Sequence, residues 1–330
     1  MPMNKRTALR LMACAGAMAG LPLRRAMAQA GDFPSKPIRW VVPYPAGGGS
    51  DFLARVAAQV MSADLKQPVV VDNKPGANGA IAVADLMRSP PDGYTLINID
   101  NGILVFNAAL YQKLGYDPER DLQLVTLLVK GPMFLAVGPA STAKDAREFF
   151  AQVRAQPGKF AFASAGAGTP QHLSMELIKK QAGLDMTHIP YKGSSPALSD
   201  LAGGQVLAAV TDYAAAGGFF KSGKLRALAV NDSVRHPSMP DVPTLRELGI
   251  EGAEAPTMVG VAVRSGTPAG LVNSLQQAVR RAILSPEVRR RYGEFGIQPV
   301  GNTPEEFQTL IRGEVKRWHP LIKNLNIRLD

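Results

Sequence analysis

A glycine-rich segment from Pro43 to Arg55 has the residues best suited to hold a small anion. An apolar run at 38–42 precedes it and apolar residues at helical spacing follow it, which predicts a strand, a tight loop and a helix. Glycine lets a ligand approach the backbone closely, and the free N–H groups at a helix start attract negative charge. Ser50 is the expected N-cap, and Asp51 suits the first helical turn. The alternative is a tight turn that binds nothing.

A second glycine loop of the same kind runs from Ser164 to His172. The apolar run 160–163 before it predicts a strand, and the next helix is expected to start with Thr169 as N-cap and Pro170 in the first position. Neither this loop nor the stretch from Tyr44 to Asp51 contains arginine or lysine. An anion at these loops would therefore be held by backbone N–H groups, with the Thr169 hydroxyl as a further donor.

Other chemistry finds little support in the residue patterns. A dinucleotide fingerprint starts at 166–168 but has Gln171 where its third glycine belongs, and a phosphate-loop spacing at 218–224 ends in Leu225 instead of serine or threonine. The sequence has no Gly-x-Ser-x-Gly motif and no histidine pair at metal-ligand spacing. No cofactor and no metal are expected. An exported hydrolase that uses His172 stays open as an alternative.

Residues 1–28 have the pattern of an export signal and are set apart from the fold. Basic residues at positions 5, 6 and 10 precede a short apolar segment at 11–23, and the triplet 26–28, Ala-Met-Ala, fits a signal-peptidase site. The apolar segment is too short for a permanent membrane anchor. Export with cleavage near Ala28 is therefore expected, by either the Sec or the Tat route.

The single cysteine, Cys14, falls inside this segment. A mature chain cleaved near Ala28 would have no cysteine, which excludes disulfides, thiolate metal sites and cysteine catalysis. The alternative is that Cys14 carries a lipid anchor. Removal of residues 1–28 also takes away five basic residues and no acidic ones, which lowers the formal net charge from +10 to +5. The basic composition belongs mostly to the export signal and gives no support to nucleic-acid binding.

The length of the chain and its two glycine loops predict two lobes. A chain of 330 residues exceeds what one hydrophobic core usually supports. Strands and helices alternate along it, which predicts an α/β fold with a mainly parallel sheet flanked by helices in each lobe. We assign 29–131 plus 255–330 to the first lobe and 132–254 to the second, so the chain crosses near Gly131 and again near 254–256.

Periodicity and turn residues give a coarse set of elements. Beyond the two runs before the glycine loops, strands are expected at 69–72, 94–99, 122–129, 134–137, 186–189, 206–210, 225–230 and 258–263. Helices after the two loops are joined by further helices at 80–88, 104–113, 142–156, 195–202, 268–284, 286–294 and 304–323. No internal repeat is evident in the sequence.

An ordered set of short motifs resembles the Bug family, the periplasmic solute receptors of tripartite tricarboxylate transporters. The motifs cover almost the whole mature chain, and their order makes the set specific. They lie at 44–51, 72–79, 91–96, 166–172, 190–193, 200–206, 223–230 and 241–245. The chain departs from the family pattern at Tyr44, at 212–213 and at 256–260, which leaves the contacts to the distal part of a ligand open.

The resemblance implies a two-lobed periplasmic-binding-protein fold of type II, a Venus flytrap that closes on a small carboxylate. In the family the glycine loops bind carboxylate oxygens, and Asn101 and Asp212 end strands that should face the same cleft. The candidate ligand-binding residues are Tyr44, Ala46, Gly47, Gly48, Ser50, Asp51, Asn101, Gly166, Gly168, Thr169, His172 and Asp212.

The function implied by the resemblance is transport without chemistry. The protein would be a periplasmic monomer that captures a mono-, di- or tricarboxylate and delivers it to integral-membrane transporter subunits. It would bind no nucleic acid, metal or cofactor. Two alternatives remain: a receptor of the same fold that feeds a signalling sensor, and the exported hydrolase.

Overall fold

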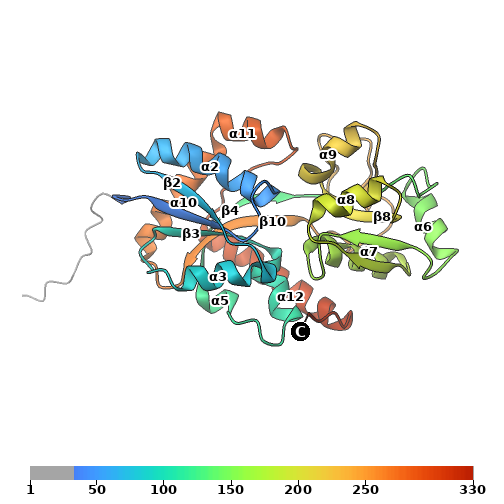
Figure 1. Cartoon of the computed structure of the whole chain (residues 1–330), viewed down its shortest axis with the longest axis horizontal. Helices are drawn as coiled ribbons and strands as arrows, with labels where there is room; N and C mark the ends of the chain where they lie inside the picture. The colour runs from blue at the N-terminus through green and yellow to red at the C-terminus, as the bar shows by residue number, and fades with distance from the viewer. Residues whose placement is uncertain (1–32, 330) are drawn as a thin grey trace, which may run out of the picture. The chain divides into compact units, whose positions relative to one another are not determined.

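The computed structural model describes residues 33–329, so the proposed export signal and Cys14 lie outside the described residues. A first sheet of five strands has the order β2-β1-β3-β10-β4 (Figure 1). Its strands are β1 (Ile38–Val42), β2 (Val69–Asn73), β3 (Thr95–Asp100), β4 (Leu122–Gly131) and β10 (Thr257–Arg264). We call this sheet and the helices packed on it lobe 1.

A second sheet of five strands has the equivalent order β7-β6-β8-β5-β9. Its strands are β5 (Met133–Val137), β6 (Ala161–Ser164), β7 (Thr187–Pro190), β8 (Ala208–Asp212) and β9 (Arg226–Val230). We call this sheet and its helices lobe 2. The two lobes belong to one compact unit, and one buried cluster holds side chains of both, such as Ile97 of β3 and Phe162 of β6.

Four of the five strands in each sheet run in one direction. In lobe 1, β1 is parallel to β2 and β3, whereas β10 is antiparallel to both β3 and β4. In lobe 2, β6 is parallel to β7 and β8, whereas β5 is antiparallel to β8 and β9. The expected mainly parallel direction is thus confirmed, but half of the strand pairs are antiparallel. The reason is that the reversed strand in each sheet is the one at which the chain arrives from the other lobe.

Helices flank both sheets. Lobe 1 has α2 (Gly49–Leu65), α3 (Ala80–Met87), α4 (Asn107–Leu110), α5 (Pro118–Asp121), α10 (Ala269–Leu284), α11 (Pro286–Gly293) and α12 (Pro304–Asn324), with the short helices η1 (Ala77–Gly79) and η2 (Gly102–Phe106). Lobe 2 has α6 (Ala146–Arg154), α7 (Pro170–Ala182), α8 (Ser194–Ala202) and α9 (Tyr213–Lys221). Figure 1 shows α2 and α3 on opposite sides of the first sheet.

Two helices differ from the sequence expectation. The stretch expected as one helix at 104–113 is the π-helix η2 followed by the four-residue α4. The turn starts earlier because the Asp100 carboxylate accepts a hydrogen bond from the N–H of Ile103 at 3.0 Å. The helix expected at 142–156 begins only at Ala146, where Asp145 is the N-cap and accepts from the N–H of Glu148 at 2.9 Å.

Candidate ligand-binding site

In each lobe the glycine loop follows the carboxyl end of the first of three neighbouring parallel strands. In lobe 1 the loop joins β1 to α2, and in lobe 2 it joins β6 to α7. Ligands of open α/β sheets bind outside the carboxyl ends of the strands, where such loops lie. Both loops therefore stand at the position where this architecture binds small molecules.

The first loop ends in a helix start that no side chain caps. The N-cap of α2 is Gly48, not Ser50 as expected, and Gly48 makes no side-chain capping hydrogen bond. Ser50 lies inside the first turn instead, where its carbonyl and its hydroxyl oxygen both accept from Nδ2 of Asn98 at 3.0 Å. The N–H groups at the start of α2 are therefore not taken up by an N-cap side chain, which makes them suitable donors for an anion.

The carboxylate of Asp51 is engaged inside the first loop. It accepts from the N–H of Gly47 at 2.9 Å, from Nε of Arg55 at 2.9 Å and from Nδ2 of Asn73 at 3.0 Å. Burial would raise the pKa of Asp51, but the hydrogen bonds from Arg55, Gly47 and Asn73 hold that pKa below its ordinary value. Asp51 is thus a negative charge that the loop already compensates.

Tyr44 begins the first loop and ties it to the end of β3. Its hydroxyl donates to the carboxylate of Asp100, and its carbonyl accepts from Nδ2 of Asn73 at 3.0 Å. Burial, followed by the nearby carboxylate of Asp100, raises the pKa of Tyr44, and burial also raises the pKa of Asp100. The backbone beyond Tyr44 is open, because Ala46, Gly47 and Gly48 are all exposed.

The second loop is closed by its own side chains. Thr169 is the N-cap of α7, as expected, and Pro170 follows it in the first turn. The Thr169 hydroxyl donates to the carbonyl of Gly166 at 2.8 Å and accepts from the N–H of His172 at 3.4 Å. Gly166 and Gly168 have φ values of +148° and +74°, which only glycine adopts without strain.

His172 supports this loop from beneath. The side chain is 5% exposed, and its Nδ1 accepts from the N–H of Gly168 at 3.0 Å. Its ring stacks on His188 with centroids 3.7 Å apart, and Nε2 of His188 lies 2.7 Å from Oγ of Ser164. Burial lowers the pKa of His172 to about 3 and that of His188 to about 4. Both rings are therefore neutral at ordinary pH and bring no cation to the site.

The side chains of Asn101 and Asp212 form hydrogen bonds with backbone groups. Oδ1 of Asn101 accepts from the N–H of Met258 at 2.6 Å, and its Nδ2 donates to the carbonyl of Pro256 at 3.4 Å, where the chain enters β10. Asp212 is the N-cap of α9 and accepts from the N–H of Ala215 at 2.9 Å. Burial raises the pKa of Asp212. The structure therefore groups the other candidates at the two loops and ties these two residues to neighbouring backbone.

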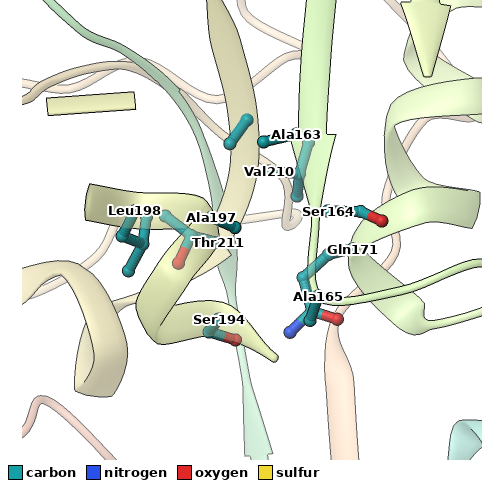
Figure 2. Close-up of a pocket in the computed structure, with 10 residues that line it drawn as sticks. Ala163, Ser164, Ala165, Gln171, Ser194, Ala197, Leu198, Val210 and Thr211 are labelled. Atoms are coloured by element: carbon teal, nitrogen blue, oxygen red, sulfur yellow. The ribbon is translucent and has the colours of Figure 1, made fainter. Parts of the chain in front are cut away.

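A small cavity of about 10 Å³ lies beside the second loop, lined mostly by alanine, leucine and valine side chains with four polar residues among them (Figure 2). Ser164 and Gln171 line one side of it, and Ser194 and Thr211 line the other. A cavity of this size is about the smallest that can hold one water molecule. The sequence interpretation did not single out Ser194, the first residue of α8. The signal in the sequence was the preceding glycine, because Gly193 is the N-cap of α8, has φ +113° and provides no capping side chain.

A larger groove lies elsewhere on lobe 1. It has a volume of about 520 Å³, and residues of α5, β4, α10 and α12 line it, with no residue of either glycine loop among them. Within residues 33–329, no group of three or more His, Cys, Asp or Glu side chains could hold a metal ion. Over the same residues, no helix has the length and apolar character needed to cross a membrane.

Two α/β lobes, each with a glycine loop at its strand ends, define a two-lobed solute-binding protein. A sequence model described as the tripartite tricarboxylate transporter family receptor matches residues 53–327. The chain belongs to this family, which confirms the resemblance found in the motifs and the two-lobed α/β fold that it implied.

Relatives support the assignment over nearly the full chain. A protein of a Pseudomonas strain, named a UPF0065 protein in the tcbD-tcbE intergenic region, is 38% identical over 88% of this chain and 86% of its own length. Protein BugT of Bordetella pertussis is 34% identical over 97% of this chain and 98% of its own.

Solved structures agree with the fold. A structure described as a periplasmic transporter has a TM-score of 0.83 at 38% identity and covers 90% of this chain and 100% of its own. The R. palustris protein Rpa4515 with adipate has a TM-score of 0.83 at 33% identity over 88% and 97%. MatC of Rhodopseudomonas palustris with bound malate has a TM-score of 0.80 at 33% identity over 88% and 100%.

Proposed function

We propose that the protein is a periplasmic receptor that captures a small organic carboxylate between its two glycine loops. In this proposal it delivers the acid to the membrane subunits of a tripartite tricarboxylate-type transporter and performs no chemistry on it. Membership of the receptor family supports this role. The proposal includes export and cleavage near Ala28, so the N-terminus of the mature protein should lie at Gln29 or within about two residues of it.

The observation that carries the proposal is the uncapped start of α2 beside an open loop. Gly48 as N-cap leaves the first-turn N–H groups without a capping side chain, and Asp51 is compensated by Arg55. A carboxylate at this place would receive backbone hydrogen bonds and the positive end of the helix dipole. It would need no arginine or lysine, in agreement with their absence from both loops.

We infer that the acid is a dicarboxylate with a short chain. Two relatives at 33% identity hold adipate and malate, and both acids carry a carboxylate at each end. One carboxylate would lie at the start of α2, and the other end would lie toward the second loop, where Thr169 and Gly166 form the turn. A diacid of this length could bridge two loops that a monocarboxylate would reach only one at a time.

The test is a binding screen by calorimetry on the mature chain. It should include malate, adipate, a monocarboxylate of equal length and a diamide of the same skeleton. We expect one diacid to bind at least ten-fold more tightly than the matched monocarboxylate, which corresponds to about 1.4 kcal/mol. Equal binding of the diamide would contradict the proposal, because a neutral amide lacks the charge that a helix start attracts. Turnover of an ester or amide in the same screen would favour the hydrolase instead.

A further inference from the structure

In both lobes a side chain four residues further along takes up the N–H of a loop glycine. Asp51 accepts from the N–H of Gly47 at 2.9 Å, and His172 accepts from the N–H of Gly168 at 3.0 Å. Both glycines have positive φ, +83° and +74°. These two N–H groups are directed into the protein and are not available to a ligand. The two loops thus share one local device although the lobes show no sequence repeat.

The acceptor in lobe 1 is a charge held by two other side chains. Arg55 and Asn73 both donate to the Asp51 carboxylate, at 2.9 and 3.0 Å. The carboxylate therefore has three donors and a cationic partner, and it keeps its place whether or not an anion is nearby. Its negative charge is offset before a ligand carboxylate arrives.

The acceptor in lobe 2 is a neutral ring in an uncharged stack. His172 stacks on His188, and His188 stacks on Phe162 with centroids 4.9 Å apart. The charged groups around the stack come from α7: Lys179 lies over the Phe162 ring at 5.2 Å and forms an ion pair with Glu176 at 2.7 Å. Only neutral imidazole can accept at Nδ1, because a protonated ring has two N–H donors and no acceptor.

We propose that Asp51 and His172 are matched positioning residues, one for each glycine loop. Each holds a glycine N–H inward and so directs the neighbouring N–H groups of its loop toward the ligand. This inference rests on the proposed function and assigns to both residues a role through the loop instead of direct contact with the acid. His172 fulfils this role as a neutral acceptor, so the second loop keeps its shape across the pH range in which an exposed histidine titrates.

The first test is NMR on the free protein and needs no ligand. A hydrogen bond between two nitrogens transmits a ¹⁵N–¹⁵N coupling, so Gly168 N should couple to Nδ1 of His172. We expect this coupling to be present at pH 8 and to persist at pH 5.5, with the ring in its Nε2–H form throughout. Absence of the coupling, or titration of His172 near pH 6.5, would overturn the proposal.

The second test compares binding of malate and adipate by three variants. His172→Ala removes the acceptor and should weaken binding about 2- to 10-fold. His172→Gln offers an amide oxygen and should recover part of that loss. His319→Gln is the control, because His319 on α12 is also hydrogen-bonded to the backbone, to the carbonyl of Val105 at 2.8 Å, but Val105 belongs to η2 and to neither glycine loop.

Three outcomes separate the two proposals. Binding by His172→Ala equal to that of the parent would overturn the positioning role, whereas equal losses in His172→Ala and His172→Gln would show that the ring contacts the acid directly and would also overturn it. If neither malate nor adipate binds the parent protein, the dicarboxylate assignment fails. The coupling measured in the free protein then decides on its own whether His172 holds the N–H of Gly168 inward.

Discussion

At the scale of single residues, carboxylate recognition without a cation requires that backbone donors be held in place. In the proposed site Thr169 would do this in the second loop, where its hydroxyl donates to the Gly166 carbonyl and accepts from the N–H of His172. Thr169→Ala should lower the free energy of unfolding by about 1 kcal/mol, the usual loss when an N-cap is removed. It should also weaken diacid binding several-fold, because the turn at Gly166 loosens. Chemical denaturation and calorimetry measure the two effects.

Thr169→Ser is the matched control for this change. Serine is also a good N-cap and keeps the hydroxyl, so both quantities should stay close to those of the parent. A loss in Thr169→Ser as large as that in Thr169→Ala would mean that the threonine methyl group, not the hydroxyl, supports the loop.

The first loop contains two adjacent glycines, Gly47 and Gly48, whose backbone conformations differ. Gly47 has φ +83°, whereas Gly48 has φ −81°, and a Cβ on either would meet nothing closer than 3.5 Å. Gly47→Ala should therefore lower the free energy of unfolding by about 1–2 kcal/mol, the strain of a left-handed residue. Gly48→Ala should affect stability less. Thermal denaturation of both variants checks this order, and equal losses would contradict it.

Residue patterns alone could predict some of this site and not the rest. Threonine followed by Pro170 predicted that Thr169 is the N-cap of α7, and the structure confirms this prediction. Ser50 was equally plausible but is the second residue of α2, where Asn98 of β3 binds its backbone carbonyl and its hydroxyl. Asp51 and His172 could have been recognised by their position four residues after a loop glycine. The sequence could not show that a carboxylate in one loop and an imidazole in the other both accept the N–H of a glycine.

At the scale of elements, most strands and helices lie close to where periodicity predicted them. The strand expected at 258–263 is β10, Thr257–Arg264, and the helix expected at 304–323 is α12, Pro304–Asn324, with its capping box of Thr303 and Glu306. The π-helix η2 was missed, because its start depends on the hydrogen bond from the N–H of Ile103 to the carboxylate of Asp100, the last residue of β3. Local propensity cannot predict such a hydrogen bond, because sequence patterns place the end of the strand only to within about two residues.

The junction of β6, β7 and α7 gives a pH prediction. Folding lowers the pKa of His172 to about 3 and that of His188 to about 4, mainly by burial. The unfolded chain therefore binds protons that the folded chain does not, so the stabilising contribution is complete above about pH 6.5 and falls as the pH drops toward 4. Asp100 and Asp212 act in the opposite direction, because burial raises the pKa of each.

A double variant isolates the histidine part of this profile. His172→Gln with His188→Gln removes both titrating rings and leaves the two aspartates in place. The difference in the free energy of unfolding between parent and variant should be constant above pH 7 and should shrink as the pH falls from 6.5 to 4.5. Urea denaturation at a series of pH values measures it, and a pH-independent difference would mean that the two rings have the same pKa values in the folded and the unfolded chain.

At the scale of the whole molecule, the two sheets have equivalent strand orders, and each contains one antiparallel strand in the same place, β10 in lobe 1 and β5 in lobe 2. The connection from β4 to β5 is the single residue Pro132, whereas the return connection from β9 to β10 runs through 231–256. The second connection is held by Asn101, which bonds the backbone of Pro256 and Met258. This placement explains why Asn101 is buried at a strand end and yet has no free amide for a ligand.

Two further contacts join the lobes outside the connections. Nε2 of His236 in lobe 2 donates to the carbonyl of Gly296 in lobe 1 at 3.0 Å, and Nδ1 of His236 accepts from the N–H of Ser238 at 3.1 Å, which fixes the tautomer. Near the second loop, a Cβ on Gly168 would lie 2.6 Å from Cδ1 of Leu329 and 2.8 Å from Cδ1 of Leu110, both in lobe 1. At Gly168 the ends of the two leucine side chains can shift to accept a methyl group, whereas at Gly296 the methyl group would meet the rigid ring of His236.

The contact at Gly296 gives a prediction for lobe closure. A ligand that bridges the loops should favour the closed arrangement, so small-angle scattering of the parent should give a smaller radius of gyration when a bound diacid saturates it. A Cβ on Gly296 would lie 2.4 Å from Cε1 of His236, so Gly296→Ala should separate the lobes and weaken both binding and the change in radius. Gly249→Ala is the control, because Gly249 has a similar φ of +80° and no atom within 4 Å of its Cβ position. A radius that stays constant on saturation of the parent would contradict closure on a bridging ligand, because it would mean either a receptor that is already closed or a site within one lobe.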